Sequence, residues 1–142
     1  KGVIVYRNNP DVEGKMNVWL AESRKVKSDL HLAIHSNGSV NHDANGVEVY
    51  VEDESSLGFS FANILYNNLF SIYPYQSPET NHGVKYAHGA LGEVNPLNIS
   101  RGVLIEIAYH DNMNDAKWIV DNYQKIGDNI ASSILSFYQI GG

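Results

Sequence analysis

The feature that most constrains this chain is a short apolar run that ends in a histidine. Leu30 to Ile34 is apolar or nearly so without a clean alternation, and His35 follows shortly before the turn-forming pair Asn37-Gly38. Such a run predicts a strand covered on both faces, with His35 at its carboxyl end. In open α/β sheets ligands bind at that edge. An imidazole there either coordinates a metal or simply hydrogen-bonds a neighbouring loop.

Strand-like and helix-like segments alternate along the rest of the chain. The expected strands are 2–7, 30–36, 46–51, 84–86 and 102–109, and the expected helices are 15–27, 56–72 and 114–138. This order predicts an α/β fold, a single domain with a mostly parallel twisted sheet and helices on both faces. The segment 46–51 alternates strictly between apolar and polar residues, which predicts a strand with one face in water.

Composition excludes several classes of function. With 142 residues the chain fits one domain that is long enough to bury a core, and it contains no apolar run of membrane-spanning length. The net charge of -6, without a basic run to offset it, disfavours nucleic acid as a partner. The absence of cysteine from the sequence excludes disulfides, thiolate catalysis and cysteine-ligated zinc.

A second residue that suggests chemistry is Glu106, which interrupts the apolar run from Val103 to Ala108. Burying an unpaired carboxylate is costly, so something must compensate this one. An ion pair with a basic residue such as Arg101, or exposure at a sheet edge, is one solution. The other is a carboxylate that faces a site, with its pKa raised so that it serves as a general base. With His35, it would form half of a zinc hydrolase site, in which the metal acidifies a bound water.

Several segments together resemble a known enzyme family. The matching segments are 29–37, 46–50, 83–85, 103–112 and 115–116. In their order and spacing they resemble the zinc-dependent N-acetylmuramoyl-L-alanine amidases of the amidase-3 family, and in particular its clostridial, spore- or phage-associated members. The resemblance implies a peptidoglycan hydrolase that cleaves the amide between N-acetylmuramic acid and the L-alanine of the stem peptide. It also implies an extracellular or cell-wall location.

The same resemblance implies roles for individual residues. His35 corresponds to the last zinc ligand of the family, and Glu106 to the glutamate that activates the zinc-bound water. Asn37 is expected to shape the site or to contact the substrate, while His110 and Asp111 belong to its rim or to its framework. The expected cofactor is Zn²⁺ and the expected partner is peptidoglycan, with no nucleic acid and no membrane span.

Family members carry an earlier strand that ends in a histidine ligand and a helix that carries a glutamate ligand. We therefore expect residues 1–142 to be the amidase-3-like catalytic domain without these two elements, with the other two zinc ligands upstream of Lys1. His31 shares a strand face with His35 but lies about 13 Å away, too far to bind the same metal. Two alternatives stay open, namely a non-catalytic wall-binding domain and a zinc peptidase on a related fold.

Overall fold

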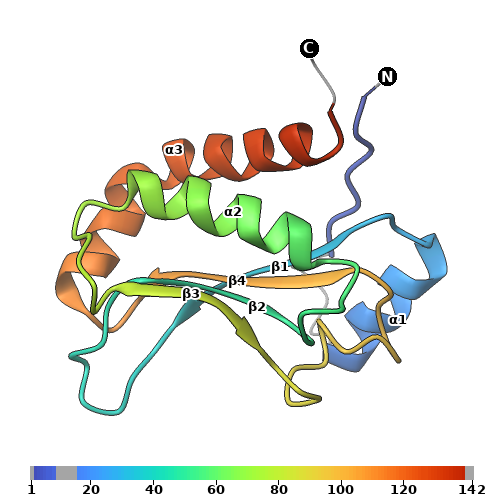
Figure 1. Cartoon of the computed structure of the whole chain (residues 1–142), viewed down its shortest axis with the longest axis horizontal. Helices are drawn as coiled ribbons and strands as arrows, with labels where there is room; N and C mark the ends of the chain where they lie inside the picture. Colours follow the sequence, from blue (N-terminus) through green and yellow to red (C-terminus); the bar gives the residue numbers. More distant parts are fainter. Residues whose placement is uncertain (1, 9–15, 140–142) are drawn as a thin grey trace.

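The computed structural model describes residues 2–8 and 16–139. It has the expected α/β architecture, a sheet and helices in one domain (Figure 1). The elements in chain order are α1 (Met16–Val26), β1 (His31–Asn37), β2 (Val47–Val51), α2 (Phe59–Ile72), β3 (Asn81–Tyr86), β4 (Gly102–Tyr109) and α3 (Met113–Phe137). Among these described helices, none is both long enough and apolar enough to span a membrane.

The four strands form one mixed sheet in the order β1-β4-β2-β3. β1 runs parallel to β4 and β2 runs parallel to β3, but β2 and β4 are antiparallel. The parallel pairings agree with the expected sheet, whereas the antiparallel pairing in its centre was not expected. It places the carboxyl ends of β1 and β4 beside the amino ends of β2 and β3, so residues from both kinds of strand end meet at one edge.

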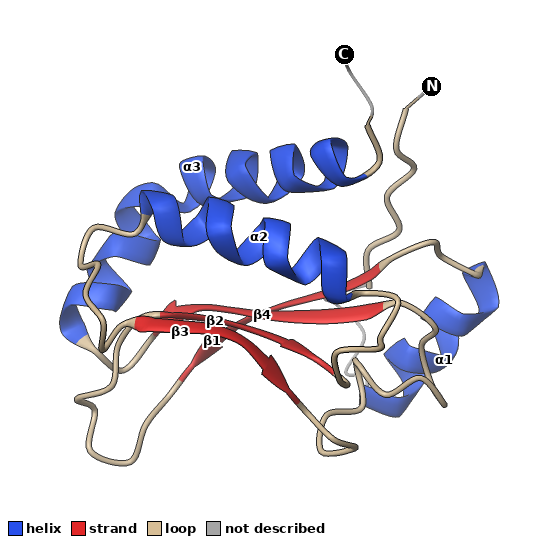
Figure 2. Ribbon diagram, viewed as in Figure 1, coloured by secondary structure: helices blue, strands red, loops and turns tan. Residues whose placement is uncertain are grey.

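Helices α2 and α3 cover one face of the sheet, while α1 lies on the side of the sheet away from them (Figure 2). Alternate residues of β2 point into the core beneath α2 and α3, and Val47, Val49 and Val51 are fully buried there. Burial of this apolar layer is the main driving force for the fold. Because side chains alternate along a strand, Glu48 and Tyr50 of β2 point to the opposite face.

The long helix α3 begins at a well-formed N-cap. The side chain of Asn112 accepts hydrogen bonds from the backbone amides of Asn114 and Asp115, which satisfies two donors that an α-helix leaves free in its first turn. From there Trp118, Ile126 and Ile130 recur at helical spacing and are buried against α2 and the sheet. The cap fixes where the helix begins, directly after the loop that follows β4.

Two expectations from the sequence were wrong. Residues 2–7 were expected to be a core strand, but they form no strand, and Ile4 and Val5 are each 80% exposed. A strand needs a neighbouring backbone to pair with, and in the described part of the chain none pairs with this segment. The polar face of β2 was expected to lie in water, but Glu48 is only 2% exposed. Polar side chains from the neighbouring strands cover it.

Candidate active site

His35 and Glu106, the two residues singled out from the sequence, lie side by side on neighbouring strands. They are register partners in the parallel pairing of β1 with β4. Register partners point to the same face of a sheet, so both side chains lie on the face away from α2 and α3. The side chain of His35 is 46% exposed, so its imidazole is accessible from solvent.

The structure shows neither the ion pair with Arg101 nor the edge position considered for Glu106. β4 lies inside the sheet, not at its edge. Arg101, the proposed ion-pair partner, instead donates to the backbone carbonyl of Asp29 at 3.2 Å and lies over the ring of Phe137. The Oε2 atom of Glu106 is buried and has no hydrogen-bond partner among the described residues. Glu106 therefore neither pairs with Arg101 nor lies at a sheet edge, and its carboxylate shares a sheet face with His35.

Burial and, next, the negative charge of Glu48 raise the pKa of Glu106 to about 7, and the charge of His110 opposes this rise. Glu48 and Glu106 are register partners across the antiparallel pairing of β2 with β4. Like charges directly opposite one another in a sheet repel, which is the origin of this contribution. A carboxyl group with a pKa near neutrality suits a general base that must both take and release a proton.

Glu48 itself is held as a carboxylate by several donors. Tyr50 Oη donates to Oε2 at 2.6 Å, while Lys85 Nζ and Tyr109 Oη donate to Oε1 at 2.9 and 2.7 Å. Burial acts to raise the pKa of Glu48, but these hydrogen bonds and the Lys85 charge outweigh it and lower the pKa. Burial and the Glu48 carboxylate also raise the pKa of both tyrosines, so they remain protonated donors.

A third carboxylate lies beside the imidazole. Glu93, in the loop before β4, has its Oε1 atom 3.5 Å from Nε2 of His35, and its side chain is only 13% exposed. It also contributes to the raised pKa of Glu106. Among the described residues, the glutamates of this face outnumber the one positive side chain beside them, Lys85, so the region has a net negative charge. This charge favours the binding of a cation or of an electron-poor carbonyl carbon.

Asn37 ends β1 and contacts the same group of residues. Its Nδ2 atom donates to Oε2 of Glu48 at 3.4 Å, and its Oδ1 atom accepts from the amide of Gly38 at 2.8 Å. The loop that follows is attached to the end of β4, since Oδ2 of Asp111 accepts from the amide of Ser39 at 2.7 Å and lies 2.9 Å from Nδ1 of His42. Asp111 therefore attaches the loop after β1 to the end of β4.

His110 secures the end of β1 in the same way. Its Nδ1 atom lies 3.0 Å from the backbone oxygen of Ser36 and 3.2 Å from the hydroxyl of that residue. Like Asp111, it holds the loop after β1 at the rim of the site.

A zinc site in this region would need more ligands than His35 alone. A catalytic zinc takes three protein ligands. The described residues contain no group of three histidine, cysteine, aspartate or glutamate side chains arranged to bind a metal. His35 has the exposed imidazole that a ligand requires, but the described residues do not by themselves fit a zinc site.

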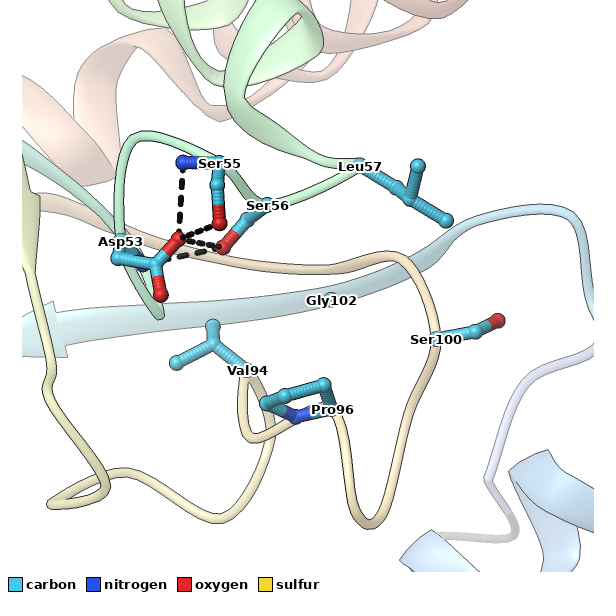
Figure 3. A pocket seen from close by; sticks show the side chains of 8 residues that line it. All are labelled: Asp53, Ser55, Ser56, Leu57, Val94, Pro96, Ser100 and Gly102. Atoms are coloured by element: carbon cyan, nitrogen blue, oxygen red, sulfur yellow. Dashed lines mark hydrogen bonds between the residues drawn. The ribbon is translucent and has the colours of Figure 1, made fainter.

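A cavity of about 320 Å³ lies elsewhere, at the amino end of β4 (Figure 3). Asp53, Ser55 and Ser56 line one side of it, and Val94 and Gly102 are among the residues of the other side. Oδ1 of Asp53 accepts from the amide and hydroxyl of Ser55, so this carboxylate stabilises a turn. The cavity contains neither His35 nor Glu106, and hydrogen bonds from Ser55 and Ser56 lower the pKa of Asp53, which makes this carboxylate a poor general base.

Sequence reasoning missed Glu48, Glu93 and Tyr109 as members of the site. The alternation in β2 places Glu48 and Tyr50 on one face, but their burial depends on the antiparallel pairing with β4, which local sequence does not encode. Glu93 lies in a loop segment without periodicity. Tyr109 was expected to be part of β4, but its position beside Glu48 depends on an irregularity in the β1–β4 register between His35 and Asn37.

Comparison with known proteins gives a family match and a shared fold. The family model described as N-acetylmuramoyl-L-alanine amidase matches residues 1–136. Among solved structures, the chain is similar to the catalytic domain of CwlV, an N-acetylmuramoyl-L-alanine amidase from Bacillus (Paenibacillus) polymyxa var. colistinus. The TM-score is 0.75 at 20% identity, over 92% of this chain and 69% of that chain.

Two further structures show the same likeness. The amidase AmiC2 of Nostoc punctiforme matches with a TM-score of 0.70 at 20% identity, over 89% of this chain and 67% of that one. The catalytic domain of the CD27L endolysin targeting Clostridia difficile matches with a TM-score of 0.67 at 20% identity, over 93% and 69%. No curated protein matches the chain in sequence. At these identities the structural matches establish the fold.

Proposed function

Because the chain belongs to the amidase-3 family of N-acetylmuramoyl-L-alanine amidases, we propose that it is a peptidoglycan hydrolase in which Glu106 is the general base. The bond cleaved is the amide between the lactyl group of N-acetylmuramic acid and the L-alanine of the stem peptide. Peptidoglycan is a polymer, and the half-exposed imidazole of His35 at the edge of the sheet is accessible to such a substrate without opening of a lid.

One observation carries this proposal. Glu106 is an incompletely paired carboxylate on an inner strand, with a buried Oε2 atom that has no partner in the described part of the chain and a pKa of about 7. A structural carboxylate in such a position would be expected to accept hydrogen bonds on both oxygens. An unpartnered oxygen beside His35 is instead suited to accept a proton from a water molecule in the site.

In the proposed reaction, water attacks the amide carbonyl carbon while Glu106 takes one of its protons. The C–N bond of the resulting tetrahedral species then breaks, and Glu106 returns the proton to the leaving nitrogen. The products are the free lactyl carboxylate on the sugar and the free α-amine of the peptide. Glu106 thus ends the cycle in the form in which it began.

We further propose that the activity depends on zinc, with His35 as one ligand and the other ligands outside the described residues. The motif resemblance supports this, and the exposed imidazole of His35 is compatible with it. The test is zinc content per chain, measured on this polypeptide and on a form extended upstream, both purified without chelator. Zinc in the extended form supports the proposal, and zinc in neither form overturns it.

The two alternatives are separated by what the protein releases. An amidase frees stem peptides from purified peptidoglycan and leaves a free linear peptide intact, whereas a zinc peptidase cleaves the peptide. A wall-binding domain sediments with peptidoglycan but releases nothing, and replacing Glu106 then changes only its stability. Release of peptides with a new α-amine on L-alanine, lost in Glu106→Gln, is the expected result.

The motifs are similar to those of clostridial, spore- or phage-associated members, and we propose that this protein is of that type and acts extracellularly or in the cell wall. Digestion of peptidoglycan from clostridia, compared with peptidoglycan from unrelated bacteria, tests the first part. Detection of the protein in wall and culture fractions tests the second.

A further inference from the structure

The buried carboxylate of Glu48 accepts a hydrogen bond from each strand of the sheet. Glu48, with a side chain that is 3% exposed, accepts from Asn37 at the end of β1, Tyr50 of β2, Lys85 of β3 and Tyr109 of β4. The three shorter contacts are between 2.6 and 2.9 Å. Such a set of donors fixes both oxygens of the carboxylate and ties the strands together at one point.

The contact from Tyr109 requires a departure from regular strand geometry. His35 pairs with Glu106 but Asn37 pairs with Tyr109, so β4 contains one residue more than β1 in this interval. In a regular strand, residues three apart point to opposite faces. The extra residue is a β-bulge, and it turns Tyr109 onto the face that carries Glu106.

Glu48 stands directly opposite Glu106 in the antiparallel pairing of β2 with β4. Two carboxylates in register would ordinarily compete for the donors around them. Here the donors are bound by Glu48, while Oε2 of Glu106 is buried without a partner in the described part of the chain. The hydrogen bonds are therefore distributed unequally. They fix the carboxylate of Glu48 and leave an oxygen of Glu106 available to accept another donor.

We propose that Glu48 is a positioning residue of the amidase: by binding Lys85 and Tyr109, it keeps both donors away from Glu106, whose open oxygen then faces the reacting water. This inference rests on the proposed function of Glu106. If Glu48 is removed, Lys85 and Tyr109 become free to hydrogen-bond Glu106 instead. The base would then be engaged and turned from its reactive orientation.

The test compares Glu48→Gln with Lys85→Met and Tyr109→Phe in the holoenzyme, with kcat and KM measured on purified peptidoglycan. Glu48→Gln is expected to lower kcat by about tenfold to hundredfold with KM within about twofold of wild type, as for other residues that orient a reacting group. Lys85→Met and Tyr109→Phe remove a competing donor together with one support of Glu48, so each is expected to lower kcat by less than Glu48→Gln does.

Crystal structures of Glu48→Gln and wild type provide a readout that does not require activity. In the variant, the Glu106 carboxylate is expected to lie within hydrogen-bond distance of Lys85 Nζ or Tyr109 Oη. An unchanged Glu106, or a lower melting temperature with unchanged kcat, overturns the positioning role and leaves Glu48 as a structural residue. If Glu48→Gln does not fold, Glu48→Asp takes its place, because its shorter side chain cannot hold both donors, and an unchanged Glu106 with wild-type kcat in that variant overturns the role equally. Wild-type protein without amidase activity would contradict the proposed function and not this inference.

Discussion

His35 and Glu106 pair in register across the parallel strands β1 and β4, and their side chains share the sheet face that the long helices leave uncovered. The two residues are 71 positions apart in the chain, so this pairing depends on the register of the sheet and not on local structure. A slip of one residue in either strand would send one of the two side chains to the opposite face. The apolar core beneath β4 opposes such a slip.

Replacing Glu106 by glutamine is expected to lower kcat on peptidoglycan by about 10² to 10⁴-fold, because the amide cannot take a proton from water. The measurement is the rate at which new α-amino groups appear in purified peptidoglycan. Glu79→Gln, at an exposed loop carboxylate, is the matched control and should retain the wild-type rate. Activity of Glu106→Gln within twofold of wild type would rule out the proposed role.

Stability of the metal-free protein should fall as the pH rises from about 4.5 to about 7. The pKa of Glu106 is near 4.5 when unperturbed and about 7 in the folded protein, so the folded state binds more protons in this window. A shift of this size corresponds to about 3 kcal/mol, which solvent screening at a half-buried site reduces to the order of 1 kcal/mol.

The measurement for this pH dependence is urea unfolding of wild type and Glu106→Gln at pH 4.5, 6 and 8. The variant lacks the titrating group, so its stability relative to wild type should be higher at pH 8 than at pH 4.5. Contributions of groups far from Glu106 cancel in this difference. A difference that is the same at every pH would contradict the raised pKa.

Asp115→Ala should destabilise the fold by about 2–5 kcal/mol. Asp115 is fully buried, and its carboxylate accepts from the amides of Gly46 and Tyr109 at 3.0 Å and from the hydroxyl of Tyr73. Removing it leaves these buried donors without an acceptor. The check is chemical denaturation beside Asp121→Ala, which removes an exposed ion pair of α3 and should cost no more than about 0.5 kcal/mol. Equal effects of the two substitutions would show that Asp115 is not a structural anchor.

His35→Asn should abolish zinc retention by the form extended upstream, because it removes the one imidazole that we assign as a ligand. His88→Asn is the control, since His88 is exposed and its φ of 47° is one that asparagine tolerates. Both proteins are dialysed in parallel and their zinc content is measured per chain. Retention of full zinc by His35→Asn would exclude His35 as a ligand.

Much of this fold follows from local sequence. β4 spans Gly102–Tyr109 as its apolar run predicts, and α3 spans Met113–Phe137 against an expected 114–138. Both elements carry strong periodic signals and clear ends, a glycine at one and an asparagine N-cap at the other. The two candidate site residues were identified because His35 ends one apolar run and Glu106 interrupts another.

Local sequence could not predict which strands pair with one another. The apolar residues of 2–7 predict a strand, yet a strand exists only where another backbone accepts its hydrogen bonds. Glu48 has the pattern of a solvent-facing residue, and its burial arises from Tyr109, 61 positions away, and Lys85, 37 positions away. Pairing order and register are tertiary properties, so the sequence pattern could not identify Glu48 as the second carboxylate of the site.

The bulge of β4 makes the site depend on chain length between Glu106 and Tyr109. Straightening the strand over this interval without removing a residue would leave both side chains chemically intact, yet it would return Tyr109 to the helix-covered face and remove a donor from Glu48. Substituting Ile107, which lies in the same interval, keeps the count and therefore the geometry. Among homologous sequences, the glutamate and the tyrosine should be three positions apart where the bulge is present and two positions apart where the strand is regular, so that this spacing and the bulge change together.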